Sequence, residues 1–271
     1  MVYFDFSIIM NHLLYRLIDE AKTTRKLNVS GMDLTSLPVL PDDLQVLNCS
    51  HNRLTSLPEL PSRLRVLNCY HNRLTVLPSL PITLLVLDCA GNELTELPWL
   101  PWIMTSLYCY INRLTTLPTL PEYLTVLDCS INRLTVLPEL PSALNILHCN
   151  DNRLTSLPKL PKTLRRLDCY TNQLTSLPNL PSTLPFIYVD ENPLNDVFKK
   201  LIHTVHPVKS IQTYYSNLHG RIHNTLNFQY TVVNNCSSVL DSDCADVISS
   251  YLSGENGTLS MQIDALKKNI C

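Results

Sequence analysis

The feature that most constrains this chain is a short phrase, LPxLP, which returns every twenty residues between Pro38 and Pro181. Sixteen of the nineteen prolines in the 271-residue sequence fall on this period. A fixed period of this length is typical of stacked structural repeats. Since a unit of twenty residues cannot bury its own apolar side, neighbouring units must cover one another. The sequence therefore predicts an elongated solenoid.

Most repeats contain the pattern LxxLxCxxNxL, as in residues 44–54. The alternation around Leu47 and Cys49 indicates a short strand with one buried face. The next leucines recur every three residues, and two are followed by proline, which removes a backbone donor and favours an extended, polyproline-II convex segment. We count eight such turns and one degenerate first turn within residues 27–192.

One asparagine in each repeat follows the strand. Its amide is predicted to satisfy backbone groups that the corner would otherwise bury unpaired. These structural asparagines are Asn52, Asn72, Asn92, Asn112, Asn132, Asn152, Asn172 and, at the end of the repeats, Asn192.

Seven of the ten cysteines share one repeat position, which Val29 and Val189 also fill, so we interpret it as a small buried apolar site. In-register strands lie about 4.8 Å apart, whereas a disulfide requires Cβ atoms about 3.8 Å apart, so bridges along the column would be strained. Free thiols favour an intracellular, reducing compartment. No histidine or acid interleaves the column, so we expect neither metal nor cofactor. The column is Cys49, Cys69, Cys89, Cys109, Cys129, Cys149 and Cys169.

These repeats, for example LPELPSRLRVLNCYHNRLT at 57–75, resemble leucine-rich repeat proteins of the short, twenty-residue LPxLP type. Bacterial type III effectors and leucine-rich repeat proteins of giant DNA viruses that infect amoebae are similar. The resemblance implies a solenoid of the α/β horseshoe class with a parallel sheet on its concave side. It implies less about function, because one fold hosts many partners.

The two ends of a solenoid need caps. Apolar residues at helical spacing over 4–24 predict a capping helix, so we assign residues 1–26 to an N-terminal cap. Asn192 and Pro193 favour the start of a helix, and further helical patterns predict a C-terminal helical cap or module over 193–271. The sequence contains no apolar run long enough for a membrane span, and its first residues lack the features of a secretory signal.

Aromatic and apolar side chains occupy strand positions that should face the concave side, where folding does not require them. Such anchors resemble an interaction hot spot; the alternative is cross-strand stacking that only stabilises the sheet. The predicted partner-binding residues are Tyr70, Tyr108, Tyr110, Tyr170, Tyr188, Val66, Val86, Asp88, Asp128 and Asp168.

Two further surfaces carry open alternatives. Trp99 and Trp102 stand on the convex side, where other repeats carry mostly small or polar residues, and indicate either a second contact or homodimer surface or local packing. A row of arginines from Arg53 to Arg153 indicates either a site for an acidic partner or solvated edge residues. The net charge of −2 gives no basic field, so we expect no nucleic-acid or membrane partner.

Enzymatic function has weak support. The triplet Cys244-Ala245-Asp246 matches the Cys-x-Asp motif of the ubiquitin-ligase domain in similar bacterial effectors, but nearby acids disfavour the thiolate. His219 and His223 lack a third metal ligand close by. We therefore predict a non-enzymatic protein–protein interaction scaffold. The alternatives are an effector with a catalytic, ligase-like tail and a structural component of a virus particle.

Overall fold

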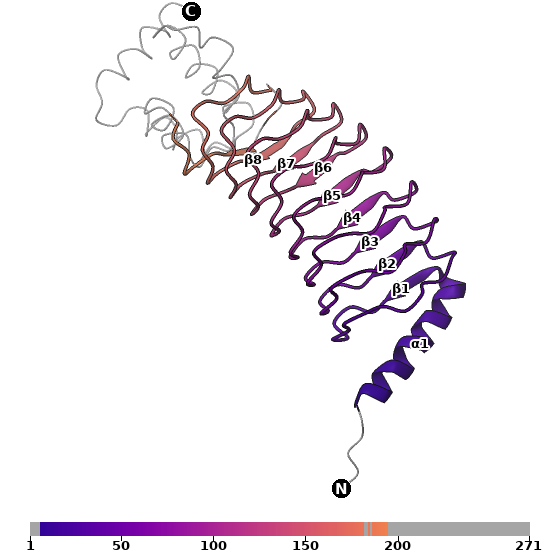
Figure 1. Ribbon diagram of the computed structural model, residues 1–271. Coiled ribbons are helices and arrows are strands. Elements are labelled where there is room, and N and C mark those ends of the chain that lie inside the picture. The colour runs from indigo at the N-terminus through magenta and orange to yellow at the C-terminus, as the bar shows by residue number, and fades with distance from the viewer. Residues whose placement is uncertain (1–5, 182–183, 185, 195–271) are drawn as a thin grey trace, which may run out of the picture.

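The computed structural model describes residues 6–181, 184 and 186–194, which form one helix and a stack of short strands (Figure 1). The helix is α1, Phe6–Thr24. The strands are β1 (Lys26–Asn28), β2 (Val46–Asn48), β3 (Val66–Asn68), β4 (Val86–Asp88), β5 (Ser106–Tyr108), β6 (Val126–Asp128), β7 (Ile146–His148), β8 (Arg166–Asp168) and β9 (Phe186–Tyr188).

All nine strands belong to one parallel sheet in sequence order. Each residue pairs with the residue twenty positions later, so Leu47 pairs with Leu67, which pairs with Leu87. The ladder continues past the strands, where Cys49 N–H donates to the Asn68 carbonyl at 2.8 Å. The predicted solenoid with a single parallel sheet is confirmed.

The interior is one continuous apolar column. In the turns of β2–β8 the middle strand residue and the cysteine two positions later are buried, as are Leu47 and Cys49, because successive strand residues point to opposite faces. In the last turn Ile187 is only partly buried. Leu44 and Leu54 close the turn from both sides and are also fully buried. Burial of one such leucine contributes about 1.5–3 kcal/mol, so the repeated leucines dominate the stability of the stack.

The structural asparagines join consecutive turns. Asn52 Oδ1 accepts a hydrogen bond from the N–H of Leu34 at 2.9 Å. Its Nδ2 donates to the carbonyl oxygens of Val29 and Cys49 at 2.8 and 3.0 Å. A third bond reaches the carbonyl of Ser50 at 3.1 Å. The side chain thus satisfies backbone groups that the corner buries, which explains why the sequence places asparagine here.

The helix α1 covers the first turn. Leu14, Ile18 and Ala21 are buried in the same core as the leucines, and α1 contacts β1. The predicted N-terminal helix is therefore confirmed over Phe6–Thr24. The predicted C-terminal helices lie outside the described residues, so the division into three regions stays a prediction. No helix of the described residues is long and apolar enough to cross a membrane.

Each turn leaves its strand through a left-handed backbone residue directly before the asparagine, or before Met32 in the first turn. Glycine adopts this conformation easily, but among these turns only Gly31 and Gly91 are glycines. Ile111 and Ile131 both have φ of 52°, which is unfavourable for β-branched residues. Their side chains are 44% and 46% exposed, so burial does not compensate for the strain.

Candidate functional site: the strand face

We define the strand face as the surface made by the first and third residues of β2–β9 and the two residues after each cysteine position. In β2–β7 the middle residue is buried and the outer two are partly exposed. The parallel register aligns equivalent residues into columns along the sheet. The concave-face columns predicted from the sequence therefore lie together on one side of the molecule.

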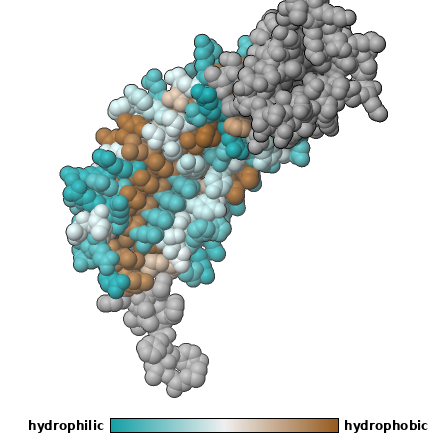
Figure 2. Space-filling view, turned by 180° about the vertical axis from the view of Figure 1, so that it is seen from behind, coloured by the Kyte–Doolittle hydropathy of each residue, from teal (hydrophilic) through white to brown (hydrophobic). Residues whose placement is uncertain are grey.

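The first column of the strand face is mostly apolar. Its partly exposed apolar members are Val46, Val66, Val86, Val126 and Ile146, and the polar residues Ser106 and Arg166 interrupt it. In the space-filling view of Figure 2, a hydrophobic stripe runs along the stack beside a hydrophilic band. A contiguous apolar stripe on a protein surface is typical of an interaction site.

The third strand residue forms the second column, and its side chain shapes the turn. Asn68 Oδ1 accepts a hydrogen bond from the Tyr70 N–H at 3.0 Å, and Asp88 Oδ1 accepts one from the Ala90 N–H at 3.2 Å. Asn28, Asn48 and Asp128 likewise accept a hydrogen bond from the N–H of the residue two positions later. Asparagine and aspartate thus perform the same structural role here, and the fold requires only an acceptor oxygen.

An aromatic cluster, defined as His51, Tyr70, His71 and Tyr110, stands next to this column. The Tyr70 ring lies 5.0 Å from the His51 ring and 6.0 Å from the Tyr110 ring, measured between centroids. Tyr70 and Tyr110 come from alternate turns, and the turn between them carries the small residue Gly91. A Cβ on Gly91 would lie 3.3 Å from the Tyr70 ring. The missing side chain therefore leaves room for the Tyr70 ring.

The carboxylate of Asp88 is next to this cluster. Burial, followed by the negative charge of Asp88, raises the pKa of Tyr110 to about 12. Burial also raises the pKa of Asp88, opposed by the hydrogen bond from Ala90 and supported by the charge of Asp128. Among the described residues, no lysine, arginine or histidine forms an ion pair with Asp88. The middle of the strand face thus carries an uncompensated negative charge.

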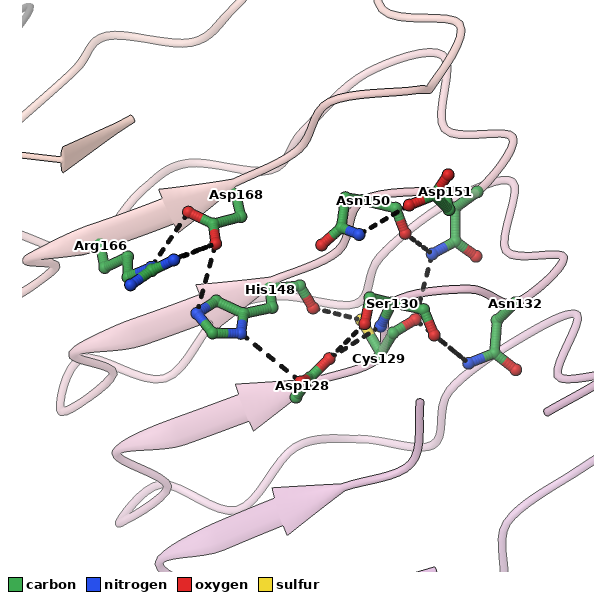
Figure 3. A network of polar contacts seen from close by, with 10 residues as sticks. Asp128, Cys129, Ser130, Asn132, His148, Asn150, Asp151, Arg166 and Asp168 are labelled. Atoms are coloured by element: carbon green, nitrogen blue, oxygen red, sulfur yellow. Dashed lines mark hydrogen bonds and ion pairs between the residues drawn. The ribbon is translucent and has the colours of Figure 1, made fainter. Parts of the chain in front are cut away.

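The carboxylates nearer the C-terminal end have partners (Figure 3). His148 lies between two of them, with Nδ1 3.5 Å from Asp128 Oδ2 and Nε2 3.5 Å from Asp168 Oδ2. Arg166 donates to Asp168 through Nη2 at 2.8 Å and also through Nε. The Arg166 guanidinium lies 5.6 Å from the centre of the Tyr188 ring. The negative charge of Asp168 is therefore neutralised locally.

Comparison with known proteins supports this architecture. Residues 43–64 match the Leucine Rich Repeat family model. The fold is a leucine-rich repeat solenoid. YopM from Yersinia enterocolitica WA-314 superposes with a TM-score of 0.63 at 41% identity over 63% of this chain. YopM from Yersinia pestis, a leucine-rich effector protein, gives 0.66 at 32% identity over 68%.

A Shigella effector leucine-rich repeat domain superposes with a TM-score of 0.55 at 26% identity, over 76% of this chain and 93% of that domain. By contrast, this solenoid spans only 38% and 55% of the two YopM chains. A search of curated proteins found no match. The likeness to bacterial effector repeats is thus shown, while the likeness to viral repeat proteins stays a prediction.

The predicted binding residues are brought together, although they differ in accessibility. Nine of the ten are partly or well exposed: Tyr70, Tyr108, Tyr110, Tyr170, Tyr188, Val66, Val86, Asp88 and Asp128. The Asp168 side chain is only 8% exposed beneath Arg166. Their role in partner binding stays a prediction. Sequence reasoning missed the exposed Ile111 and Ile131, whose signal was an apolar residue directly before the asparagine.

The convex tryptophans and the arginine row are exposed in the solenoid. Trp99 and Trp102 are 61% and 59% exposed, and the Trp102 ring lies 6.0 Å from the ring of Tyr123. Arg113 pairs with Glu93 of the preceding turn at 2.9 Å, with both side chains largely in water. Such surface pairs contribute about 0–1 kcal/mol, which favours the interpretation of solvated edge residues.

The cysteine column consists of seven buried, free thiols. Burial raises the pKa of Cys49 to about 12, so this thiol is not an activated nucleophile. Within the described ranges no three histidine, cysteine, aspartate or glutamate side chains gather around a common metal position. The Cys244 triplet and the pair His219 and His223 lie outside the described residues.

Proposed function

We propose that this chain is a non-enzymatic interaction scaffold that binds a partner protein along its strand face. The leucine-rich repeat fold and its likeness to effector repeat domains support this proposal, because such repeats generally serve as protein-interaction scaffolds. The finer proposal concerns which surface binds and what kind of molecule it takes.

The observation that carries the proposal is the pair of exposed isoleucines at strained positions. Ile111 and Ile131 each adopt a left-handed backbone that glycine would adopt more easily, and each exposes nearly half of its side chain. Neither folding nor burial accounts for this choice. They occupy the repeat position of His51 and His71 on the strand face, and Ile111 directly follows Tyr110 of the aromatic cluster, so we include them in one surface suited to a protein partner.

The cysteine column supports an intracellular location. The seven column thiols are free, which suits a reducing compartment. Burial raises the pKa of Cys89 and Cys169 strongly, so these thiols are held protonated. We therefore propose a protein partner and no cofactor.

The test is replacement of Tyr70, Tyr108, Tyr110 and Tyr170 by serine in the full chain. Circular dichroism and chemical denaturation would first establish that the quadruple variant folds. A photo-crosslinking residue at the exposed position 131 would trap partners covalently, and mass spectrometry would identify them. The affinity of each variant would then be measured with the purified partner. We expect the quadruple variant to lose at least a hundredfold in affinity, since four aromatic anchors are removed.

The control is the double variant Trp99→Ser and Trp102→Ser, which removes two exposed aromatic side chains from the convex side. Retained binding by this control, together with loss in the tyrosine variant, supports the proposal. Unchanged binding by a folded tyrosine variant would contradict it. If only the tryptophan variant loses its partner, or changes from dimer to monomer by light scattering, the convex pair is the interaction surface.

A further inference from the structure

Negative charge is distributed unevenly along the strand face. At β8, Asp168 is paired with Arg166 and approached by His148. At β4, Asp88 has only the backbone N–H of Ala90 as its hydrogen-bond donor, and no cation of the described chain pairs with it. One part of the same column is thus compensated internally, and another part is not.

Folding does not explain the charge at Asp88. Its acceptor oxygen makes the bond that Asn48 and Asn68 make at the same place in earlier turns, with distances between 3.0 and 3.2 Å. An asparagine at position 88 would therefore preserve the turn. The ionised carboxylate adds a desolvation cost, since burial disfavours its charged form. The fold therefore does not require the negative charge of Asp88.

We propose that the β3–β6 part of the strand face binds an extended, lysine- or arginine-containing segment of the partner, with cationic side chains against Asp88 and Asp128. This inference rests on the proposed function and specifies the partner's chemistry. Asp88 is the main anchor because it lacks a cation. Asp128 is secondary because His148 and Ser130 already contact its carboxylate.

The spacing of the two carboxylates fits such a segment. Asp88 pairs in register with Tyr108, which pairs with Asp128, so the carboxylates are two strands apart. Two strand spacings are roughly 10 Å, and three residues of a segment extended as polyproline II span roughly 9 Å and return the side chain to the same side. Cationic side chains three residues apart would therefore match both carboxylates.

The aromatic cluster adds a second source of affinity for cations. The rings of Tyr70 and Tyr110 lie 6.0 Å apart at 38° on the side of the column where Asp88 stands, and the pKa of Tyr110 responds to the Asp88 charge. Lysine and arginine bind favourably over tyrosine faces. A cation that enters here meets a carboxylate and aromatic rings together.

The experiment uses nine-residue peptides titrated into the isotope-labelled full chain, followed by NMR. One peptide carries two lysines three residues apart, and matched peptides carry glutamine or glutamate instead. We expect the lysine peptide alone to shift the amides of β3–β6. Asp88→Asn should weaken the affinity for the lysine peptide at least fivefold, and Asp128→Asn should weaken this affinity less. Raising the salt concentration from about 0.05 M to about 0.5 M should also weaken it.

A gain-of-charge variant provides the matched control. Asn48→Asp adds a carboxylate two strands from Asp88 and retains the turn bond, so it should strengthen lysine-peptide binding about threefold. Equal binding of the lysine and glutamine peptides, or an unchanged affinity in Asp88→Asn, would overturn the inference.

The two proposals fail in different ways. If the tyrosine variant loses the purified partner while Asp88→Asn combined with Asp128→Asn retains full affinity, the basic-segment inference is wrong and the scaffold function stands. If neither variant affects binding of the partner, both proposals are wrong.

Discussion

Asn92 Oδ1 accepts a hydrogen bond from the backbone N–H of Leu74, eighteen residues earlier, at 2.9 Å. The Nδ2 of the same side chain donates to the carbonyl oxygens of Cys69 and Cys89 in two consecutive turns, at 3.1 and 3.0 Å. A single primary amide therefore holds neighbouring turns together, and it uses both its donor and its acceptor. Stability should depend on both.

We expect Asn92→Ala to lower the free energy of unfolding by about 3 kcal/mol, because it leaves several buried backbone groups unpaired. Asn92→Asp retains the acceptor but places a carboxylate beside carbonyl oxygens, so it should be at least as damaging. Urea denaturation measures both. The exposed Asn179→Ala is the control and should change stability by less than about 0.5 kcal/mol. A similar effect at both positions would contradict the assigned role of the amide.

Ile131→Gly should stabilise the solenoid and weaken its binding. Release of left-handed strain favours glycine by about 1–2 kcal/mol, which exceeds the entropic cost of glycine of about 0.5–1 kcal/mol. A gain of about 0.5–1 kcal/mol in thermal or urea denaturation is expected. Val136→Gly, at an exposed position whose φ is not positive, should instead destabilise by a similar amount. Equal loss in both variants would show that Ile131 is not strained.

Loss of charge at Asp128 should lower the free energy of unfolding, whereas loss of charge at Asp88 should leave it unchanged or raise it. Burial alone would raise the pKa of Asp128, but hydrogen bonds from His148 and Ser130 lower it below the ordinary 3.8. Its stabilisation is therefore complete above that ordinary value and is lost as the pH falls through the lower folded-state pKa. Asp128→Asn should cost roughly 1–2 kcal/mol at neutral pH, and this cost should shrink in acid.

For Asp88 the sign is reversed, because burial raises its pKa above the ordinary 3.8 in the folded state. Its ionisation lowers the free energy of unfolding as the pH rises from the ordinary pKa towards the higher folded-state pKa. Asp88→Asn should therefore be neutral or stabilising at neutral pH. Urea midpoints of both variants, measured from neutral pH into acid, would test the pair, and destabilisation by Asp88→Asn at neutral pH would refute this assignment.

The seven column thiols should be protected from Ellman's reagent in the native chain and should react in concentrated guanidinium chloride, where the core no longer covers them. Burial raises the pKa of these thiols and excludes the reagent, as for Cys109 and Cys149. Fewer than seven protected thiols under native conditions would contradict a continuous buried column. Mass spectrometry of alkylated, unreduced protein would show whether disulfides had formed instead.

The sequence predicted the stack because one simple rule operates in every turn. The alternation at Leu47 and Cys49 placed these residues inside, and it placed Val66 and Tyr108 on the opposite side. Because the period is fixed, equivalent residues of successive turns could be predicted to lie side by side in the sheet. The strand face could thus be located before its contacts were known.

Two features of the site could not be predicted in the same way. The usual signal for a left-handed turn is glycine, so the strain at Ile131 was not visible. The position of His148 between Asp128 and Asp168 depends on side-chain orientation across three strands, and residues twenty positions apart give no local signal of it. The position of His148 arises from packing between turns, whereas the strain at Ile131 lies in the backbone of its own turn.

The uniform register of the turns also bears on how such a protein changes over generations. Unequal recombination within the coding sequence would insert or delete one twenty-residue unit and leave every interior contact type intact. An insertion between Asp88 and Asp128 would increase their separation by one strand spacing, roughly 5 Å. Related proteins that gain or lose one repeat could therefore bind longer or shorter ligands, and each of them would keep the solenoid fold.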